Sequence, residues 1–215
     1  MKRTTHKRAT AGLIILCVYL GLVITFELVR ALTSIPIVEW LASSPAGLAR
    51  GEWWRLVTSA FVVEGPVAPQ IAITAILGGL IIWFRGSWMF WGIATAGHIF
   101  GTLFTYVAVI GAGTLTLHQL HHFLGAPDYG ISLIWSSALG ALAGAAWLGP
   151  DGSVKSVYRP WLSFGAFSLM IIVVILSSGD DAIQHAVAFV IGALLIAAFD
   201  RRGEIRRHPT LKQAA

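Results

Sequence analysis

The chain has 215 residues, of which 56% are hydrophobic and only 12% are charged, and its mean hydropathy is +0.76. Soluble domains carry roughly 25% charged residues, so this composition excludes an ordinary soluble protein and predicts a membrane protein. The net charge of +5 is interpreted as a signal of membrane topology, and no nucleic acid is expected as a partner.

Six continuous apolar runs are long enough to cross a hydrocarbon core, which needs about 20 helical residues. Their apolar residues do not alternate with polar ones, as in the strands of a barrel, so helices are expected. The runs cover about residues 12–34, 67–84, 88–112, 130–148, 160–178 and 181–199. The predicted fold class is therefore all-α, a polytopic six-helix membrane domain at 12–199 between basic tails at 1–11 and 200–215.

The basic residues predict the orientation of these helices. Twelve of the fifteen Lys and Arg lie within residues 2–8, at Arg85, within 155–159 or within 201–212. Six crossings would put all of these segments on one side, as the positive-inside rule requires. We therefore expect a multi-pass protein of the cell membrane, surrounded by the lipid bilayer, with both termini cytoplasmic.

The first run is too long for the apolar core of a signal peptide, so a retained helix is expected. Its Cys17 is the single cysteine of the chain, which excludes an intrachain disulfide. The loop at about 35–66 contains Trp54 and Arg55, and both residue types favour the headgroup layer of a membrane. This loop is therefore expected to lie in the outer interface.

Histidines in the third run and in the loop after it raise the question of metal or haem binding. His98 lies near the middle of the run, and packing is preferred to haem ligation because no second histidine is level with it. His118, His121 and His122 have the spacing of ligands on one helical face, but only Asp128 offers a third ligand. Contact with lipid headgroups is the preferred interpretation, so no metal and no cofactor is predicted.

Ser132 and His185 are the residues from which we expect chemistry. Ser132 lies about 5 Å below the outer end of its predicted helix, and His185 lies about 6 Å below the outer end of the last one. The two side chains thus share a depth and a side of the membrane. An ionisable residue inside a membrane is a functional candidate, because its burial costs free energy unless it is paired or wet.

Rows of small residues put the same two side chains on facing surfaces. One row consists of Ser132, Ser136, Gly140 and Gly144, and the other of His185, Ala188 and Gly192. Small residues let helices approach closely in lipid, so packing of the rows would bring serine and histidine together. The imidazole would then take the hydroxyl proton and return it to a leaving group. Gly130 would admit the substrate, and the free amides of the helix start would bind an oxyanion.

These motifs resemble the rhomboid intramembrane serine proteases. The resemblance is carried by Gly130-x-Ser132 with Gly140, by Asp181-x-x-x-His185 with Gly192, by Trp54-Arg55 and by Arg85-Gly86-Ser87. It implies a six-helix rhomboid-like bundle with Ser132 as nucleophile and His185 as general base. It further implies transmembrane helices as partners and structural roles for Trp54, Arg55, Gly140 and Gly192.

The chain departs from the family pattern at three places. Leu133 follows the serine where the family has a small residue. Pro66 and Gln70 stand where the second helix of the family carries a His-x-x-x-Asn pair that binds the oxyanion, so Gln70 is expected to donate an amide there. Ser136 replaces a tyrosine that stacks on the histidine.

Two functions therefore stay open. The first is a serine protease that cleaves single-pass membrane proteins near the outer membrane face. The alternative is a pseudoprotease that binds transmembrane helices without hydrolysis, which Leu133 and the missing histidine of the second helix favour. A small transporter is disfavoured, because neither inverted repeats nor broken helices are found in the sequence.

Overall fold

The computed structural model describes residues 2–113, 115–147, 158–177 and 179–207. These residues form helices joined by short segments, and one isolated antiparallel bridge pairs Ser43 with Asp128. The helices are α1 (Lys2–Leu32), α2 (Ile37–Leu41), α3 (Pro45–Ala49), α4 (Arg55–Thr58), the 3₁₀ helix η1 (Ser59–Phe61), α5 (Val67–Arg85), α6 (Ser87–Ala112), α7 (Leu117–Gly125), α8 (Ile131–Trp147), α9 (Arg159–Leu176) and α10 (Gly179–Arg207).

Five of the described helices are long and apolar enough to cross a membrane. Their spans are Ala9–Leu32, Val67–Arg85, Ser87–Ala112, Arg159–Leu176 and Gly179–Asp200. Large apolar side chains such as Trp88, Phe84 and Ile175 are exposed on these helices, where lipid rather than water would cover them. The chain is thus an all-helical, multi-pass membrane protein.

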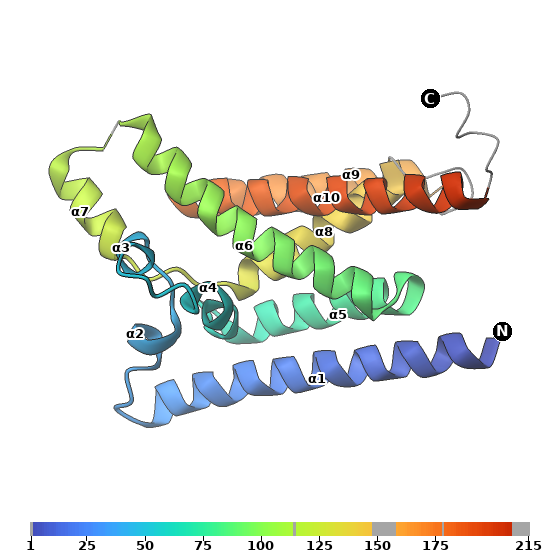
Figure 1. Cartoon of the computed structure of the whole chain (residues 1–215), viewed down its shortest axis with the longest axis horizontal. Helices are drawn as coiled ribbons and strands as arrows, with labels where there is room; N and C mark the ends of the chain where they lie inside the picture. Colours follow the sequence, from blue (N-terminus) through green and yellow to red (C-terminus); the bar gives the residue numbers. More distant parts are fainter. Residues whose placement is uncertain (1, 114, 148–157, 178, 208–215) are drawn as a thin grey trace.

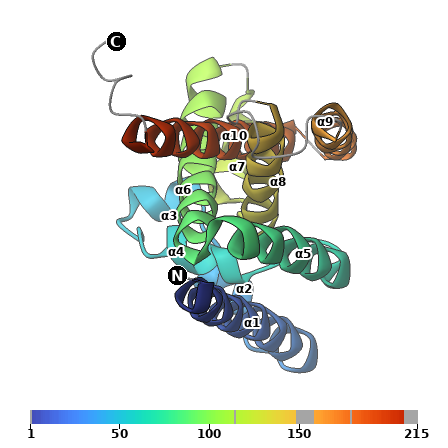
Figure 2. The ribbon, with the colours of Figure 1, turned by 90° about the vertical axis from the view of Figure 1, so that its right-hand side faces the viewer.

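The sixth predicted span, 130–148, takes a different form. Its described part is the 17-residue helix α8, about 26 Å long at 1.5 Å per residue, and the prediction extends to residue 148, outside the described residues. Nearly all of its residues are buried, because it packs against α5, α6, α9 and α10. Figure 2 shows α8 enclosed by these neighbours, with α1 on the far side of α5.

The short helices gather at one end of the bundle, which we call the loop end. It contains α2, α3, α4 and α7, whereas α1 begins and α10 ends at the opposite end (Figure 1). The first and last helices extend further into the two flanking tails than predicted. The helix α1 starts at Lys2, inside the expected tail 1–11, and α10 continues to Arg207, while residues 208–215 of the other tail and Lys155 lie outside the described residues.

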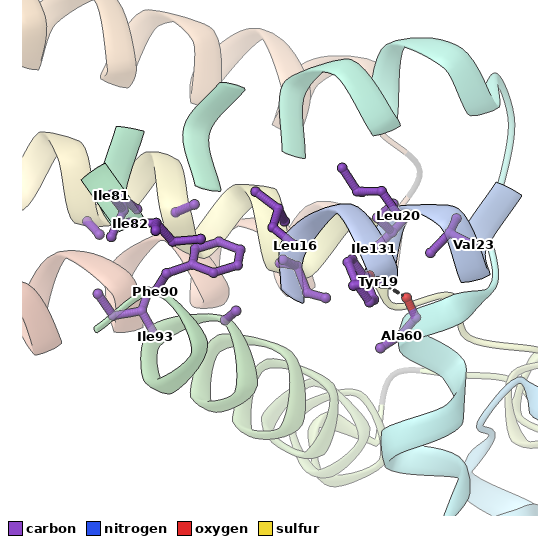
Figure 3. Packing of buried hydrophobic residues seen from close by; sticks show 14 of the residues in the cluster. Leu16, Tyr19, Leu20, Val23, Ala60, Ile81, Ile82, Phe90, Ile93 and Ile131 are labelled. Carbon is purple, nitrogen blue, oxygen red and sulfur yellow. Dashed lines mark hydrogen bonds between the residues drawn. The ribbon is translucent and has the colours of Figure 1, made fainter. Parts of the chain in front are cut away.

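The main apolar core lies between α1, α5, α6 and α8. Phe90, Ile82 and Ile93 are fully buried in it, and Leu16 and Tyr19 of α1 pack against them from the side (Figure 3). Gly86 joins α5 to α6 with φ +94°, a conformation that glycine adopts without strain. At this same end, Arg85 forms a salt bridge with Asp200 of α10.

The loop at 35–66, which was predicted to lie in the outer interface, has an exposed part and a part buried in the bundle. Trp53 and Trp54 are exposed, but residues 59–63 enter the bundle, where Ser59, Val62 and Val63 are fully buried. Buried backbone must be hydrogen-bonded, and side chains of helix α1 satisfy three groups of this segment. The Tyr19 hydroxyl donates to the Ala60 carbonyl at 2.6 Å, as Figure 3 shows.

The second anchor of this segment is an ion pair. Glu27 and Arg30, 3.0 Å apart, hold the backbone of Val63 from both sides. The Val63 amide donates to Glu27 Oε1 at 3.0 Å, and Arg30 donates to the Val63 carbonyl at 3.0 Å. The pair, which sequence alone would class as an ordinary surface contact, therefore fixes a buried turn beside α8.

Candidate functional site

A cavity of about 470 Å³ opens at the loop end, bordered by α5, α8, α9 and α10. Both residues of the predicted dyad line it, as do polar groups from each neighbouring element. The lining residues are Glu64, Pro66, Gln70, Tyr129, Ser132, Trp135, Val173, Leu176, Ser177, Asp181, Gln184 and His185. The structure therefore brings Ser132, His185 and Gln70 to one site.

His185 is held in place by two contacts that the sequence analysis did not predict. Its ring stacks on Trp135 of α8, with centroids 5.6 Å apart and planes inclined by 23°. Its Nδ1 lies 3.2 Å from the Ser177 hydroxyl, at the end of α9. Its Nε2 is buried and has no hydrogen-bond partner among the described residues. The ring is thus fixed at one nitrogen and unengaged at the other.

Ser132 lies in the first turn of α8 and is half-buried. Because Nε2 of His185 has no partner in the described part of the chain, the two side chains share the cavity without a hydrogen bond between them. Catalytic hydrogen bonds are often long in the free protein and tighten when substrate binds. A dyad would require a movement that brings the Ser132 hydroxyl to this nitrogen.

The close approach of α8 and α10 explains how these residues reach one site. A Cβ atom on Gly140 would lie 1.9 Å from the Phe189 carbonyl oxygen, and one on Gly192 would lie 1.9 Å from the Ser137 carbonyl oxygen. At Gly144 the Ala193 carbonyl oxygen lies 2.5 Å from such an atom. Only glycine permits this distance between backbones, so the small-residue rows pack against each other.

Gly130 makes room for a neighbouring segment of the protein. Its amide donates to the Ser59 carbonyl at 2.9 Å. A Cβ at this position would lie 2.3 Å from Cε1 of His98 and 2.7 Å from Cα of Ala60. The glycine therefore lets the buried turn at 59–63 support the start of α8, directly before Ser132.

Gln70, which was expected to donate to an oxyanion, lines the cavity, as does Pro66, which has no donor to offer. Pro66 precedes α5, and Gln70 lies in the first turn of that helix. The Gln70 amide donates to the carbonyl of Glu64, whereas its Oε1 has no partner among the described residues. The amide is therefore occupied by the chain itself and would have to turn to reach an oxyanion.

The remaining departures from the family pattern have definite positions. Leu133 is fully buried and does not line the cavity, so it leaves the space around Ser132 open. Ser136 is also fully buried, and Trp135, one residue earlier, occupies the face of His185. The prediction had placed Ser136 at the stacking position. Residues three apart on a helix lie on the same face, so the position of Ser132 would have indicated Trp135 as the residue that stacks on His185.

Trp54 and Arg55 lie away from the cavity. Trp54 is 58% exposed, as expected for a residue at a membrane surface. Arg55 forms a salt bridge with Glu52 at 2.7 Å and donates to the carbonyls of Glu39 and Ala42. It therefore connects the short helices α2 and α4, which agrees with a structural role.

The other histidines have different surroundings. Nε2 of His98 lies 3.2 Å from the Ser59 hydroxyl, so its partner comes from the buried turn of the first loop. His118, His121 and His122 are exposed on α7. Within the described ranges, no group of three or more His, Cys, Asp or Glu side chains could hold a metal ion.

Comparisons with known proteins add no assignment. The chain matches no model of a protein family, no curated protein and no solved structure. The resemblance to rhomboid proteases therefore rests on its motifs. The class that the fold itself defines is an all-helical, multi-pass membrane protein with a cavity, lined by both polar and apolar side chains, at the loop end of its bundle.

Proposed function

We propose that this protein is a rhomboid-like intramembrane serine protease that cleaves single-pass membrane proteins at the loop end of its bundle. The observation that carries this proposal is a buried histidine nitrogen without a partner, in a cavity that also contains a serine hydroxyl. A buried polar atom without a protein partner costs free energy, and in a cavity a ligand or a reacting group can supply that partner.

The residues around the cavity support a complete reaction. With Nδ1–H of His185 donating to Ser177, Nε2 would carry the lone pair that accepts a proton. Ser132 Oγ would attack the substrate carbonyl carbon while its proton passes to Nε2, which then protonates the amine as the C–N bond breaks. Water would hydrolyse the acyl-enzyme by the same route.

The substrate helix would have to unwind at the cavity. A peptide bond inside a helix is shielded by its own hydrogen bonds, and an unwound backbone inside lipid would be unsatisfied. Polar groups that line the cavity, including Glu64, Asp181 and Gln184, would give an extended segment hydrogen-bond partners. The site therefore fits a substrate whose helix ends near the membrane boundary.

The test is cleavage of a quenched fluorescent transmembrane peptide in proteoliposomes. The proposal predicts cleavage by the wild type and none by Ser132→Ala or His185→Ala, whereas His98→Ala, a matched buried histidine, continues to cleave. Equal signals from the wild type and Ser132→Ala would overturn hydrolysis.

A second function, binding of transmembrane helices without hydrolysis, is favoured by one specific observation. The Gln70 amide is bonded to the Glu64 carbonyl, so the oxyanion donor expected from α5 is engaged elsewhere. Loss of one such donor lowers rates by about 10²- to 10³-fold. Peptide binding that is equal for the wild type and Ser132→Ala, with no cleavage by either protein, would identify this function.

A further inference from the structure

Asp128 lies between α7 and α8, four residues before Ser132, and its side chain is 8% exposed. Its backbone amide donates to the Ser43 carbonyl at 2.8 Å. Its carboxylate accepts from the Tyr106 hydroxyl at 3.0 Å and from the Ser43 hydroxyl at 3.5 Å, and these two hydroxyls lie 3.0 Å apart. The residue is therefore bound to both the first loop and α6.

The same carboxyl group reaches α10. The buried side chain of Gln184 lies close enough to Asp128 to lower the pKa of that carboxyl group. Gln184 directly precedes His185, and Asp128 precedes the turn that presents Ser132. One side chain thus contacts the two segments that carry the predicted nucleophile and base.

The charge state of Asp128 fits these contacts. Burial raises the pKa of Asp128 to about 6, against the opposing effect of the hydrogen bonds, so the group is mainly ionised at neutral pH. The groups that face it are the Tyr106 and Thr102 hydroxyls of α6, the Gln184 amide of α10 and the Ser43 hydroxyl, and Asp181 contributes a nearby negative charge. An ionised carboxylate only accepts hydrogen bonds, so it suits surroundings that offer hydroxyl and amide donors.

We propose that Asp128 is a positioning residue, which holds the start of α8 and the first turns of α10 in the arrangement that lets His185 meet Ser132. This inference rests on the proposed function, because it concerns the geometry of the same dyad. It goes beyond that function by assigning a role to a carboxyl group that lies outside the cavity lining.

This role matters because the reaction rate of a dyad depends strongly on the positions of its two side chains. The imidazole and the serine hydroxyl share the cavity without a hydrogen bond, so whether they meet depends on how their two segments are placed. A misplacement of about 1 Å can cost about 100-fold in rate. The segment before α8 is held at two points. The Gly130 amide is bonded to the Ser59 carbonyl, and Asp128, two residues earlier, holds the preceding part of the segment.

The experiment uses the single cysteine of the chain. A background with Cys17→Ser and Ser132→Cys carries one thiol, at position 132, whose alkylation by iodoacetamide is followed from pH 5 to 9. A nearby imidazole lowers the pKa of a thiol by pairing with the thiolate. Adding His185→Ala should return that pKa to its ordinary range, which shows that the thiol reports on the dyad.

Adding Asp128→Asn instead should raise the thiol pKa by about one unit, which slows alkylation at pH 6 about tenfold. Asp180→Asn, an acid at the same end of α10, serves as the matched control and should leave the profile unchanged. The total amount of alkylated thiol is measured as well. A variant that loses folded protein changes this amount, whereas a change in the dyad shifts the thiol pKa.

Two outcomes contradict the inference and are distinguishable. A profile that responds to His185→Ala but not to Asp128→Asn would mean that Asp128 only stabilises the fold. A profile that does not respond to His185→Ala would mean that no dyad forms, which removes the proposed function and the positioning role together.

Discussion

His98 and His185 are two buried histidines on membrane-spanning helices, 3% and 9% exposed. Each has one ring nitrogen 3.2 Å from a serine hydroxyl, of Ser59 and Ser177 respectively. Each also has a second nitrogen without a hydrogen-bond partner among the described residues. By burial and bonding alone, the two side chains are nearly equivalent.

They differ in the space beside them. A Cβ atom on Gly130 would lie 2.3 Å from the His98 ring, so α8 is packed directly against it. His185 borders a cavity of about 470 Å³ together with Ser132. A hydrogen bond and burial therefore do not distinguish a structural histidine from a functional one, whereas access to a shared cavity does.

The largest expected effect separates the two histidines by reactivity. His185→Ala should slow modification of Ser132 by a fluorophosphonate by about 10²- to 10⁴-fold, the usual contribution of a general base. His98→Ala should leave the rate for folded protein close to that of the wild type. Rates are measured by gel fluorescence against time. Equal losses of rate in both variants would show that the two histidines do not differ in function.

The second effect concerns the approach of α8 to α10, which brings His185 to Ser132. Gly140→Ala places a methyl group 1.9 Å from a backbone carbonyl oxygen, and overpacking of this kind costs about 3 kcal/mol of the free energy of unfolding. Gly21→Ala is the matched control, because nothing lies within 4 Å of its Cβ position. Unfolding in mixed micelles measures both, and a stable Gly140→Ala variant would contradict the close packing.

The third effect is a pH dependence that originates beside the His185 site. The pKa of Asp128 rises from 3.8 to about 6 on folding, so the folded state holds its proton more tightly. The free energy of unfolding should therefore fall as pH rises from about 4 to about 6, by roughly 3 kcal/mol, and stay level above that.

Asp128→Asn should remove this part of the pH dependence. The difference between the wild-type and variant unfolding curves isolates it from Glu64, whose pKa is also raised by burial and by Asp181 and Asp180. Unfolding free energies at pH 4, 5, 6 and 7 give the comparison. Parallel curves over this range would show that Asp128 is not titrating as stated.

The smallest effect compares the two serine partners. Ser59→Ala should lower the free energy of unfolding by about 1 kcal/mol, a typical net value for one hydrogen bond, and leave Ser132 reactivity unchanged. Ser177→Ala should slow that reactivity about fivefold, the equivalent of about 1 kcal/mol in the barrier. If the two effects were exchanged, the roles assigned to the histidines would be wrong.

The sequence was sufficient to predict the membrane class and to single out three residues that line the cavity, Ser132, His185 and Gln70. Helical spacing placed Ser132, Gly140, His185 and Gly192 on facing rows, and the structure packs those rows together. This succeeded because small residues at intervals of four describe a single helical face. The start of α8 is at Ile131, one residue after the predicted start, since the Gly130 amide is bonded to the Ser59 carbonyl of the buried turn.

The rest of the site depends on contacts between distant segments. The pairing of His98 with Ser59, the stacking of Trp135 on His185 and the Ser177 contact join residues from different elements. No spacing rule relates residues from separate helices, so these contacts had to come from the fold. The entry of residues 59–63 into the bundle was missed for the same reason.

The most direct test of the central claim is the site of fluorophosphonate attachment in the detergent-purified protein. Intact mass and peptide mapping are compared for the wild type, Ser132→Ala and His185→Ala. We predict one adduct, on Ser132, that both substitutions abolish. Absence of an adduct from a folded wild type, or an adduct that persists in Ser132→Ala, would contradict an activated serine at this site.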